Sequence, residues 1–524
     1  MGSNRLYSVL FVILSLYNIV KAASILALFS SLSFSDHLVF RAYVSLLTQK
    51  GHSVVLMTPY PGQFQYPDLE NIVELDVGGE SAQFWDEFKF LLTSTDDYFP
   101  RQRAIDELSL RIAIAQLRSK QMTALFINPH IKFDLVITEA DVPLLYAVAE
   151  KYNAPHIAIT TSSGKLHQHE AKGNPIHPVL YLDVNTLNTG RNISRWQKII
   201  EYYRLIRTRN EYYYNYLPLC DLASKKIFGT QRDLLEIEYD IDMLFVASNP
   251  ILDGNRPNVP AVIHVDRMHI KPTGQLPPNL KATLDSASNG AIYFSMGALQ
   301  EPENLSPSIL QTLLEAFSEL PYTVLWRIAN TTGINIPNNV VTKSWFPQQN
   351  VLGHPNVKLF ITSGGQRSLE EAVFYQVPIL GFPILRPRRN FIMQVTKFDA
   401  GELVDPYQLD KETLKSKITE IVTLEKYKKA MTKLKNMVFD PFISGPETAV
   451  WWTEYVLRHK GAKHFRSPAV GIGIVKYYLL DIICYVTIGS IIMLYSTFLM
   501  LKFIIKRLRV RFGKGESDSK YKVL

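Results

Sequence analysis

The chain has 524 residues, of which 47% are hydrophobic, and it carries a formal net charge of +8. This length and composition suffice for substantial cores, so a globular body of two domains is the default expectation. Most of the charge lies in residues 502–524, where eight basic residues against two acidic ones contribute +6. The basic balance is therefore local, and binding of nucleic acid loses its main support.

The first 22 residues are typical of a secretory signal peptide. Arg5 precedes an apolar run over residues 6–20, and Val20 and Ala22 supply small or apolar residues where a signal peptidase reads the chain. Exported proteins share this order of basic residue, apolar segment and cleavage site. We expect the body to begin near residue 23 and to fold in a lumen.

Short apolar segments with strand character then alternate with helix-length amphipathic ones. The expected strands of the first half are residues 25–29, 53–57, 133–138 and 156–160. Gly51 stands where the C-terminus of the first helix favours a residue with positive φ. The alternation predicts a parallel sheet covered by helices on both faces.

A second set of the same kind follows a crossing rich in proline and asparagine, residues 248–260. Its expected strands are residues 291–297, 323–328, 358–365 and 377–383. The sequence thus predicts an α/β fold of two doubly wound, Rossmann-like domains, residues 23–250 and 251–470. Ligands in such sheets bind beyond the carboxyl ends of the strands, here in a cleft between the two domains.

The C-terminal region predicts a membrane anchor. Residues 482–501 are twenty consecutive uncharged residues, and a helix of that length crosses a hydrocarbon core about 30 Å thick. We place the transmembrane helix at residues 477–501 and a cytosolic tail at 502–524, because positive charge marks the cytoplasmic side. The final KYKVL has lysines three and five places from the end, as in dilysine retrieval signals. A single-pass type I protein of the endoplasmic reticulum membrane follows.

Three glycosylation sequons, at Asn192, Asn304 and Asn330, agree with a lumenal body. The two cysteines are Cys220 in the body and Cys484 in the span. They predict no lumenal disulfide within the chain.

Residue types suited to a nucleotide gather in residues 344–383. Trp345 can stack on a base and Gln348 can hydrogen-bond to its edge. Gly364-Gly365 lets backbone approach phosphate, and Glu371 can accept from ribose hydroxyls. Taken singly, these residues also suit a core aromatic, a surface amide, a turn and a solvated helix face.

Together with GAIYFSMG (290–297), the segment 448–467 and the features of both ends, this constellation resembles the membrane-bound animal UDP-glycosyltransferases, which include the glucuronosyltransferases. The resemblance covers essentially the whole chain. It implies a GT-B fold in which the N-terminal half binds the acceptor and the C-terminal half binds a UDP-sugar. It also implies an inverting transfer, in which a histidine deprotonates the acceptor hydroxyl and an aspartate orients that histidine.

The resemblance implies no metal and no cofactor, because the UDP-sugar is the donor substrate. The partners implied are a UDP-sugar or UDP, a small lipophilic acceptor, the membrane, and related transferases in homo- or hetero-oligomers. The acceptor is not specified by the sequence. The tyrosines of residues 211–218 could line its pocket, or belong to a helix packed on a neighbour or on the membrane surface.

The chain departs from the family at the expected base. Counting back sixteen residues from His52, the family's histidine position is occupied by Asp36, and the adjacent His37 corresponds to a variable neighbour. The family's orienting aspartate is Glu139 here, with Asp141 as an alternative partner. Carboxylates in a confined site raise one another's pKa, and a carboxylate of raised pKa can still act as a general base.

Asp36 also has a purely structural interpretation, which we prefer from the sequence. Aspartate is a favoured helix N-cap, and a helix over residues 37–50 would begin directly after it.

The donor side is altered as well. The resemblance assigns contacts with phosphate to Ser363, Gly364, Gly365 and Ser368. Ser363 replaces a histidine of the family, and Pro387-Arg388 replaces its sugar-binding Asp-Gln pair. Arg386, Arg388 and Arg389 could restore positive charge near the diphosphate or meet an acidic sugar, although the sequence slightly favours a solvated basic loop.

Two functions remain open at this stage. One is transfer of a hexosyl group from a UDP-sugar to a small lipophilic acceptor. The other is a catalytically silent protein that binds UDP or a lipophile, or that partners active transferases.

Overall fold

The computed structural model describes residues 22–62, 71–93, 98–181, 193–297, 305–328, 330–385, 388–440 and 443–519. The chain divides into two compact units, Met1–Ser467 and Pro468–Leu524. Several expected features lie outside the described residues: the signal peptide up to residue 21, the sequons at Asn192 and Asn304, Pro387, and the terminal KYKVL.

In the described part of the first half, a seven-stranded sheet has the order β3-β2-β1-β4-β5-β6-β7, and all neighbouring strands are parallel. Strands β1 to β3 therefore follow one another toward one edge of the sheet, and strands β4 to β7 follow one another toward the other edge. Ligands in such sheets bind where this change of direction occurs, beyond the carboxyl ends of β1 and β4. The strands are β1 (Ser24–Leu28), β2 (Ser53–Thr58), β3 (Ile72–Asp76), β4 (Leu135–Glu139), β5 (His156–Thr160), β6 (Met243–Val246) and β7 (Val262–His264).

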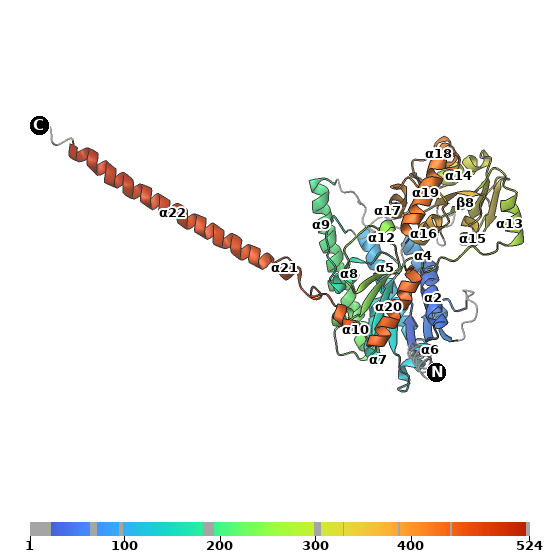
Figure 1. Ribbon diagram of the computed structural model, residues 1–524, viewed down its shortest axis with the longest axis horizontal. Coiled ribbons are helices and arrows are strands. Elements are labelled where there is room, and N and C mark those ends of the chain that lie inside the picture. Colours follow the sequence, from blue (N-terminus) through green and yellow to red (C-terminus); the bar gives the residue numbers. More distant parts are fainter. Residues whose placement is uncertain are drawn as a thin grey trace, which may run out of the picture. The chain divides into compact units, whose positions relative to one another are not determined.

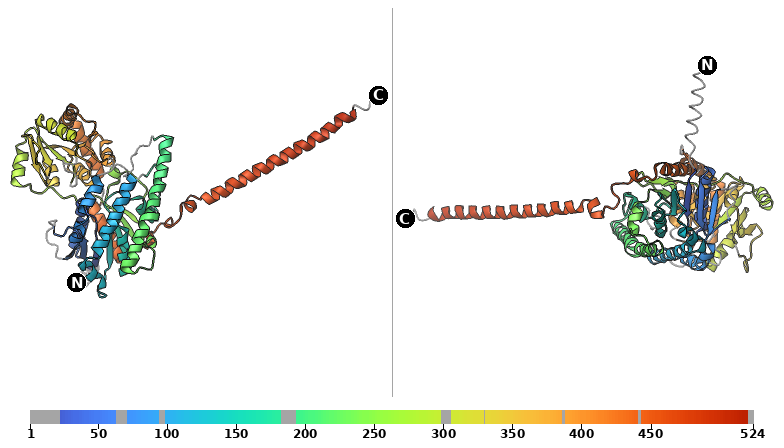
Figure 2. Two further views of the ribbon diagram at one scale, coloured as in Figure 1. Left: turned by 180° about the vertical axis from the view of Figure 1, so that it is seen from behind. Right: turned by 90° about the horizontal axis from the view of Figure 1, so that it is seen from below.

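Helices cover both faces of this sheet (Figures 1 and 2). Side chains alternate along β1, so Leu26 and Leu28 enter one core while Ile25 and Ala27 enter the other. The helices of this half are α2 (Phe34–Gln49), α3 (Gly78–Ala82), α4 (Trp85–Thr93), α5 (Tyr98–Leu117), α6 (Lys120–Ile127), α7 (Tyr146–Tyr152), α8 (Leu166–Lys172), α9 (Arg195–Asn210), the π-helical η2 (Glu211–Tyr216), α10 (Leu217–Phe228), α11 (Leu234–Tyr239) and α12 (Pro250–Asp253).

The second half has a six-stranded sheet within its described residues, again parallel throughout, in the order β10-β9-β8-β11-β12-β13. Its strands are β8 (Ala291–Ser295), β9 (Thr323–Arg327), β10 (Val340–Lys343), β11 (Val357–Thr362), β12 (Ile379–Gly381) and β13 (Gly401–Leu403). Its helices are α13 (Pro278–Asp285), α14 (Pro307–Ser318), α15 (Gln348–Leu352), α16 (Gln366–Phe374), α17 (Arg388–Thr396), α18 (Lys411–Thr423) and α19 (Glu425–Val438). The prediction of two parallel α/β sheets is confirmed.

The last helix of the larger unit, α20 (Gly445–His459), returns to the first sheet and packs beside α2 (Figure 1). Its Ala449 and Val456 belong to the core that β1 and α2 share. β7 also extends the first sheet past residue 250, where the sequence placed the domain boundary. Segments from both sides of the linker therefore complete the first half.

Helix α2 begins earlier than expected. Its N-cap is Ser33, whose carbonyl accepts from the backbone N–H groups of Asp36 (3.1 Å) and His37 (3.3 Å). The prediction that Asp36 is the N-cap is therefore wrong, because Asp36 lies within the first turn. An acidic residue there still stabilises the helix through its dipole.

The smaller unit contains α21 (Ile474–Tyr477) and the long α22 (Leu480–Ser519). Within the described residues, one helix is long and apolar enough to cross a membrane, over Leu480–Arg511 with a mean hydropathy of 2.0. Its side chains are not buried in the protein. A membrane-spanning role for this helix agrees with the sequence.

Candidate active site

Asp36 lies just beyond β1, at the change of direction of the first sheet. Its Oδ1 accepts a hydrogen bond from Oγ1 of Thr161, 2.8 Å away, at the end of β5. The hydroxyl of Ser31 stands 3.5 Å from its Oδ2. Burial raises the pKa of Asp36, and the hydroxyls of Thr161 and Ser33 oppose that rise by binding the charged form. The result is a positioned carboxylate that holds a proton more readily than a free aspartate.

His37 is buried and lies away from this carboxylate. Its Nε2 lies 2.7 Å from the carbonyl oxygen of Ser31, and its Nδ1 lies 3.3 Å from the hydroxyl of Thr58. The imidazole also contacts the ring of Tyr60 edge-on. Burial lowers the pKa of His37 to about 4. The ring is therefore a neutral part of the interior, and the geometry does not favour it as a base.

Glu139, at the end of β4, holds the loop that carries Asp36. Its Oε2 accepts hydrogen bonds from the backbone N–H groups of Ser30 and Ser31, each at 2.9 Å. Burial is the largest cause that raises the pKa of Glu139 to about 8, and the charges of Asp141 and Asp36 add to it. The side chain thus positions the backbone before Asp36, whereas the sequence placed it opposite the Asp36 carboxylate.

Residues from the second half of the chain contact the region around Asp36. Arg367 of α16 is buried, and its Nη2 donates to the carbonyl oxygen of Thr161, whose hydroxyl binds Asp36. The charge of Arg367 lowers the pKa of Asp36. The ring of Phe34 at the start of α2 meets Trp345 edge-on, with centroids 5.5 Å apart. The two halves therefore bring their predicted sites together.

The residues predicted to hold uridine form one cluster. Gln348 donates through Nε2 to Oε2 of Glu371 at 2.6 Å and to the hydroxyl of Ser368 at 3.0 Å. Gln349 donates to the other oxygen of Glu371 at 2.9 Å. Trp345, three residues before Gln348, has 54% of its surface exposed, so part of the indole is accessible for stacking.

The turn from β11 into α16 packs closely against α17. Gly364 has φ +89°, and a Cβ there would lie 2.7 Å from Ile392 and 2.9 Å from the carbonyl oxygen of Arg388. Only glycine fits that position. Gly365 is the N-cap of α16, so the free N–H groups and positive dipole end of this helix lie at the turn.

Arg388, the first residue of α17, contacts residues next to the turn between β11 and α16. Its Nη1 donates to the hydroxyl of Ser363 at 2.6 Å and to the carbonyl oxygen of Met296 at 3.1 Å. Burial lowers the pKa of Arg388 to about 10, which leaves the guanidinium charged at neutral pH. The solvated loop that the sequence favoured is therefore wrong for Arg388, whereas the neighbouring Arg389 is exposed. Positive charge therefore stands beside Ser363, the residue at the position where the resemblance implies a histidine of the family.

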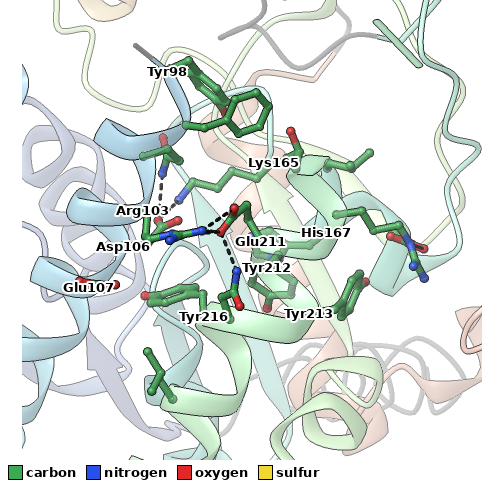
Figure 3. Close-up of a pocket in the computed structure, with 18 residues that line it drawn as sticks. Tyr98, Arg103, Asp106, Glu107, Lys165, His167, Glu211, Tyr212, Tyr213 and Tyr216 are labelled. Carbon is green, nitrogen blue, oxygen red and sulfur yellow. Dashed lines mark hydrogen bonds and ion pairs between the residues drawn. The ribbon is translucent and has the colours of Figure 1, made fainter. Parts of the chain in front are cut away.

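A pocket in the first half opens between α5, α8 and the π-helical turn η2, and its space is about 820 Å³ including the part open to solvent (Figure 3). Its wall is aromatic, with Tyr212, Tyr213 and Tyr216 on η2. Its charged groups include the ion pair of Arg103 with Glu211 at 2.6 Å, whereas the buried hydroxyls of Tyr213 and Tyr216 have no hydrogen-bond partner among the described residues. Tyr212, Tyr213 and Tyr216 thus both pack in the core and line a pocket, whereas Tyr214 is 72% exposed.

Lys165 connects this pocket to the Asp36 region. Its Nζ lies 3.5 Å from Asp106 in the pocket and 3.3 Å from Asp141, which follows β4. Asp141 in turn accepts from the hydroxyl of Thr160, the residue before Thr161. The pocket and the carboxylate are therefore separated by a short chain of polar contacts.

A family model described as "UDP-glucoronosyl and UDP-glucosyl transferase" matches residues 25–516. The chain belongs to this family. The ecdysteroid UDP-glucosyltransferase of Spodoptera littoralis nuclear polyhedrosis virus is 31% identical, over 91% of this chain and 96% of its own. UDP-glucosyltransferase 2 of Dactylopius coccus is 29% identical, over 91% and 93%.

Solved structures place this UDP-glycosyltransferase in the GT-B fold. Spinosyn forosaminyltransferase SpnP is 15% identical, covers 84% of this chain and 100% of its own, and has a TM-score of 0.56. A UDP-glucosyltransferase from Polygonum tinctorium is 14% identical, covers 84% and 99%, and has a TM-score of 0.55. At these identities the likeness concerns the fold alone.

Thr161, Arg367 and Lys165 were not identified from the sequence of this UDP-glycosyltransferase. Thr161 follows a predicted strand at its carboxyl end, so the rule on ligand positions in parallel sheets could have found it. Arg367 lies two residues after the double glycine, but its contact with Thr161 spans the two halves and leaves no local pattern. The site of this family member therefore combines predicted residues with partners that only the fold supplies.

Proposed function

We propose that this family member transfers a hexosyl group from a UDP-sugar to the hydroxyl of a small lipophilic acceptor, with Asp36 as the general base. The observation that carries the proposal is the position of Asp36. It stands beyond β1 with a raised pKa, bound by Thr161, which Arg367 of the nucleotide half contacts in turn. A carboxylate whose pKa moves toward neutrality is a more effective base than a free aspartate.

In the proposed reaction the acceptor hydroxyl gives its proton to Asp36 while its oxygen forms a bond to the anomeric carbon of the sugar. The bond from that carbon to the diphosphate oxygen breaks, and UDP leaves with the electron pair. Attack from the face opposite the leaving group inverts the configuration. Thr161 holds Oδ1 at 2.8 Å, whereas Oδ2 has the long 3.5 Å contact with the hydroxyl of Ser31, so Oδ2 is the oxygen that receives the proton.

The second half supplies the groups for the leaving diphosphate. Arg388, together with the N-terminus of α16 behind Gly364 and Gly365, offers positive charge and N–H donors to its developing charge. Trp345 offers a face to uracil, and Glu371 offers carboxylate oxygens to the ribose hydroxyls. In the nucleotide complex Glu371 exchanges part of its contacts with Gln348 and Gln349 for these hydroxyls.

The pocket beside η2 is the proposed acceptor site. Aromatic walls suit an apolar ring system, and the paired charges of Arg103, Glu211 and Asp106 leave directional polar groups for its substituents. We place the body in the lumen of the endoplasmic reticulum, anchored by α22 as a type I protein. The orientation rests on the basic residues that follow the apolar segment, and the endoplasmic reticulum is the location that the resemblance to the membrane-bound animal UDP-glycosyltransferases implies.

The test measures UDP release and product formation by the purified full chain. UDP-glucose and UDP-glucuronate are each offered with a panel of phenols, alcohols and amines. Asp36→Asn keeps the size of the side chain and removes the base, so turnover should fall by roughly 100-fold or more. Asp86→Asn is the matched control, because Asp86 is also an acidic residue in the first turn of a helix, α4, and is exposed. Turnover by Asp36→Asn at the wild-type rate overturns Asp36 as the base.

A silent UDP-binding protein is the second candidate, and the contacts of Glu139 favour it. In this structure Glu139 accepts from the amides of Ser30 and Ser31, and the nearby imidazole of His37 contacts Ser31 and Thr58 instead, so Glu139 does not orient a histidine base. This function predicts uridine nucleotide binding that Trp345→Ala abolishes, with no turnover on any acceptor. Creation of turnover by Asp36→His in an otherwise inactive wild type supports it. Calorimetry with UDP, UDP-glucose and UDP-glucuronate adds a direct measure, since equal affinities mean that the sugar is not held.

A further inference from the structure

Helix α9 turns an apolar face to solvent. Trp196, Ile199, Ile200, Tyr203 and Ile206 have exposed fractions of 74%, 57%, 46%, 61% and 38%. Their spacing of three and four residues places them on one side of the helix. Surface helices of a soluble protein normally pack such an apolar stripe against the core. In α9 the apolar stripe faces solvent instead.

The side of α9 that faces the protein is polar. Glu201 is 1% exposed, and its Oε1 accepts from Arg204 at 2.8 Å. At the end of the helix, Arg209 donates to Glu170 of α8 at 2.9 Å. A capping box of Ser194 and Gln197 defines its start. These contacts hold the helix against the body with its apolar residues outward, and α9 lies at the edge of the body in Figures 1 and 2.

The charge of α9 indicates which kind of surface its apolar face can contact. Its sixteen residues include five basic side chains and a single acidic one, Glu201, which is buried. A second copy of the same face would bring these cations together in a symmetric contact and would be repelled. A bilayer surface accepts the same pattern, since tryptophan, tyrosine and isoleucine enter the headgroup region while arginine and lysine meet phosphates.

We propose that α9 lies in a membrane interface, with the face of Trp196, Ile199, Ile200, Tyr203 and Ile206 buried among lipid headgroups and upper acyl chains. This surface is a second membrane attachment in addition to the helix α22, and it does not depend on the catalytic role of Asp36. α9 continues directly into η2, and its Thr208 and Arg209 line the aromatic pocket. A lipophilic molecule that leaves the bilayer at α9 would therefore meet the pocket first.

The experiment measures the depth of single labelled sites in the full chain reconstituted into lipid nanodiscs. Cys484→Ser removes the thiol in the span, and Cys220 is buried, so a new cysteine can carry a nitroxide selectively. Trp196→Cys and Tyr203→Cys report the apolar face. Lys198→Cys reports another face of the same helix, and Tyr407→Cys reports an exposed aromatic site in the second half, 67% exposed.

Collision with oxygen, which concentrates in lipid, is compared with collision with a water-soluble nickel chelate. We expect oxygen to dominate at residues 196 and 203 and the chelate to dominate at 198 and 407. Raising the phosphatidylserine content of a phosphatidylcholine disc should increase the oxygen preference at 196 and 203 by twofold or more. Chelate access at all four sites overturns the proposal. Spin–spin broadening at 196 or 203 that persists in detergent assigns the face to a second copy and overturns it as well.

Discussion

Asp36 is subject to opposing influences on its protonation. Burial raises its pKa, whereas the hydroxyls of Thr161 and Ser33 and the charge of Arg367 stabilise the carboxylate and lower it. The net direction is upward. Because Thr161 supplies a hydrogen bond from its side chain and receives Arg367 on its backbone carbonyl, substitution can remove the first contact and keep the second.

Thr161→Val should therefore raise the pKa of Asp36 further, because the ionised form loses a donor. In a working transferase the acid limb of kcat/KM would move to higher pH, and turnover at low pH would fall more than turnover at high pH. Thr161→Ser keeps the hydroxyl and serves as the control. The measurement is the pH profile of UDP release for the three proteins. An unchanged acid limb in the valine variant would show that Asp36 does not set it.

Arg388 and Arg389 are adjacent and differ in environment. Arg388 binds Ser363 and Met296 beside the phosphate turn, whereas Arg389 is exposed. Arg388→Gln should weaken UDP binding by roughly tenfold, because a charge-assisted contact with phosphate is lost. Arg389→Gln should bind UDP as the wild type does. Calorimetry with UDP and with uridine separates the effects, since uridine lacks phosphate and its affinity should not change.

At the scale of elements, the turn between β11 and α16 depends on one glycine more than on its neighbour. Gly364→Ala places a methyl group against Ile392 and backbone at a positive φ, so we expect a loss of about 1–3 kcal/mol in stability together with loss of UDP binding. Gly365→Ala meets only the hydroxyl of Ser368, at 3.8 Å, and should fold normally. Thermal unfolding of both variants checks the difference. Equal melting temperatures would contradict the assigned strain.

Elements defined by local pattern were predictable from the sequence. The eight expected strands all form, with ends within three residues of the expectation, because buried parallel strands produce uninterrupted apolar runs. The expected start of α2 was wrong by three residues, because Ser33 and Asp36 are both favourable N-cap residues and the sequence does not show which of them caps the helix. β7, with three residues, is too short to stand out from the linker.

Contacts between distant residues could not be predicted in the same way. Trp345, Gln348, Glu371 and the glycine pair share one segment, and the structure joins Gln348 to Glu371 and to Ser368 by hydrogen bonds. The links from Arg367 to Thr161 and from Glu139 to the loop before Asp36 join residues more than a hundred positions apart. Such pairs depend on the register of two sheets and on the meeting of the two halves.

For the molecule as a whole, α20 joins the end of the body to its beginning. The chain passes through the second half and then returns to pack Ala449 and Val456 against the core of β1 and α2. Tyr43 of α2 and Thr453 of α20 share a buried hydrogen bond of 2.5 Å. Thr453 also donates to the carbonyl oxygen of Ala449 within its own helix. Loss of the contact between the two hydroxyls therefore leaves Tyr43 without a partner, whereas Thr453 keeps its hydrogen bond to Ala449.

Tyr43→Phe, Thr453→Val and the double variant form a cycle that measures this connection. Each single change should lower the free energy of unfolding by about 1 kcal/mol, because the buried hydrogen bond is lost. Thr453→Val also leaves the hydroxyl of Tyr43 without its partner, whereas Tyr43→Phe leaves Thr453 bound to Ala449. The double variant should cost less than the sum of the two, since the remaining polar partner is removed as well. Urea unfolding of the full chain in detergent supplies the comparison. Strictly additive losses would mean that the two hydroxyls act independently, and that α20 is held to the first half by its apolar contacts alone.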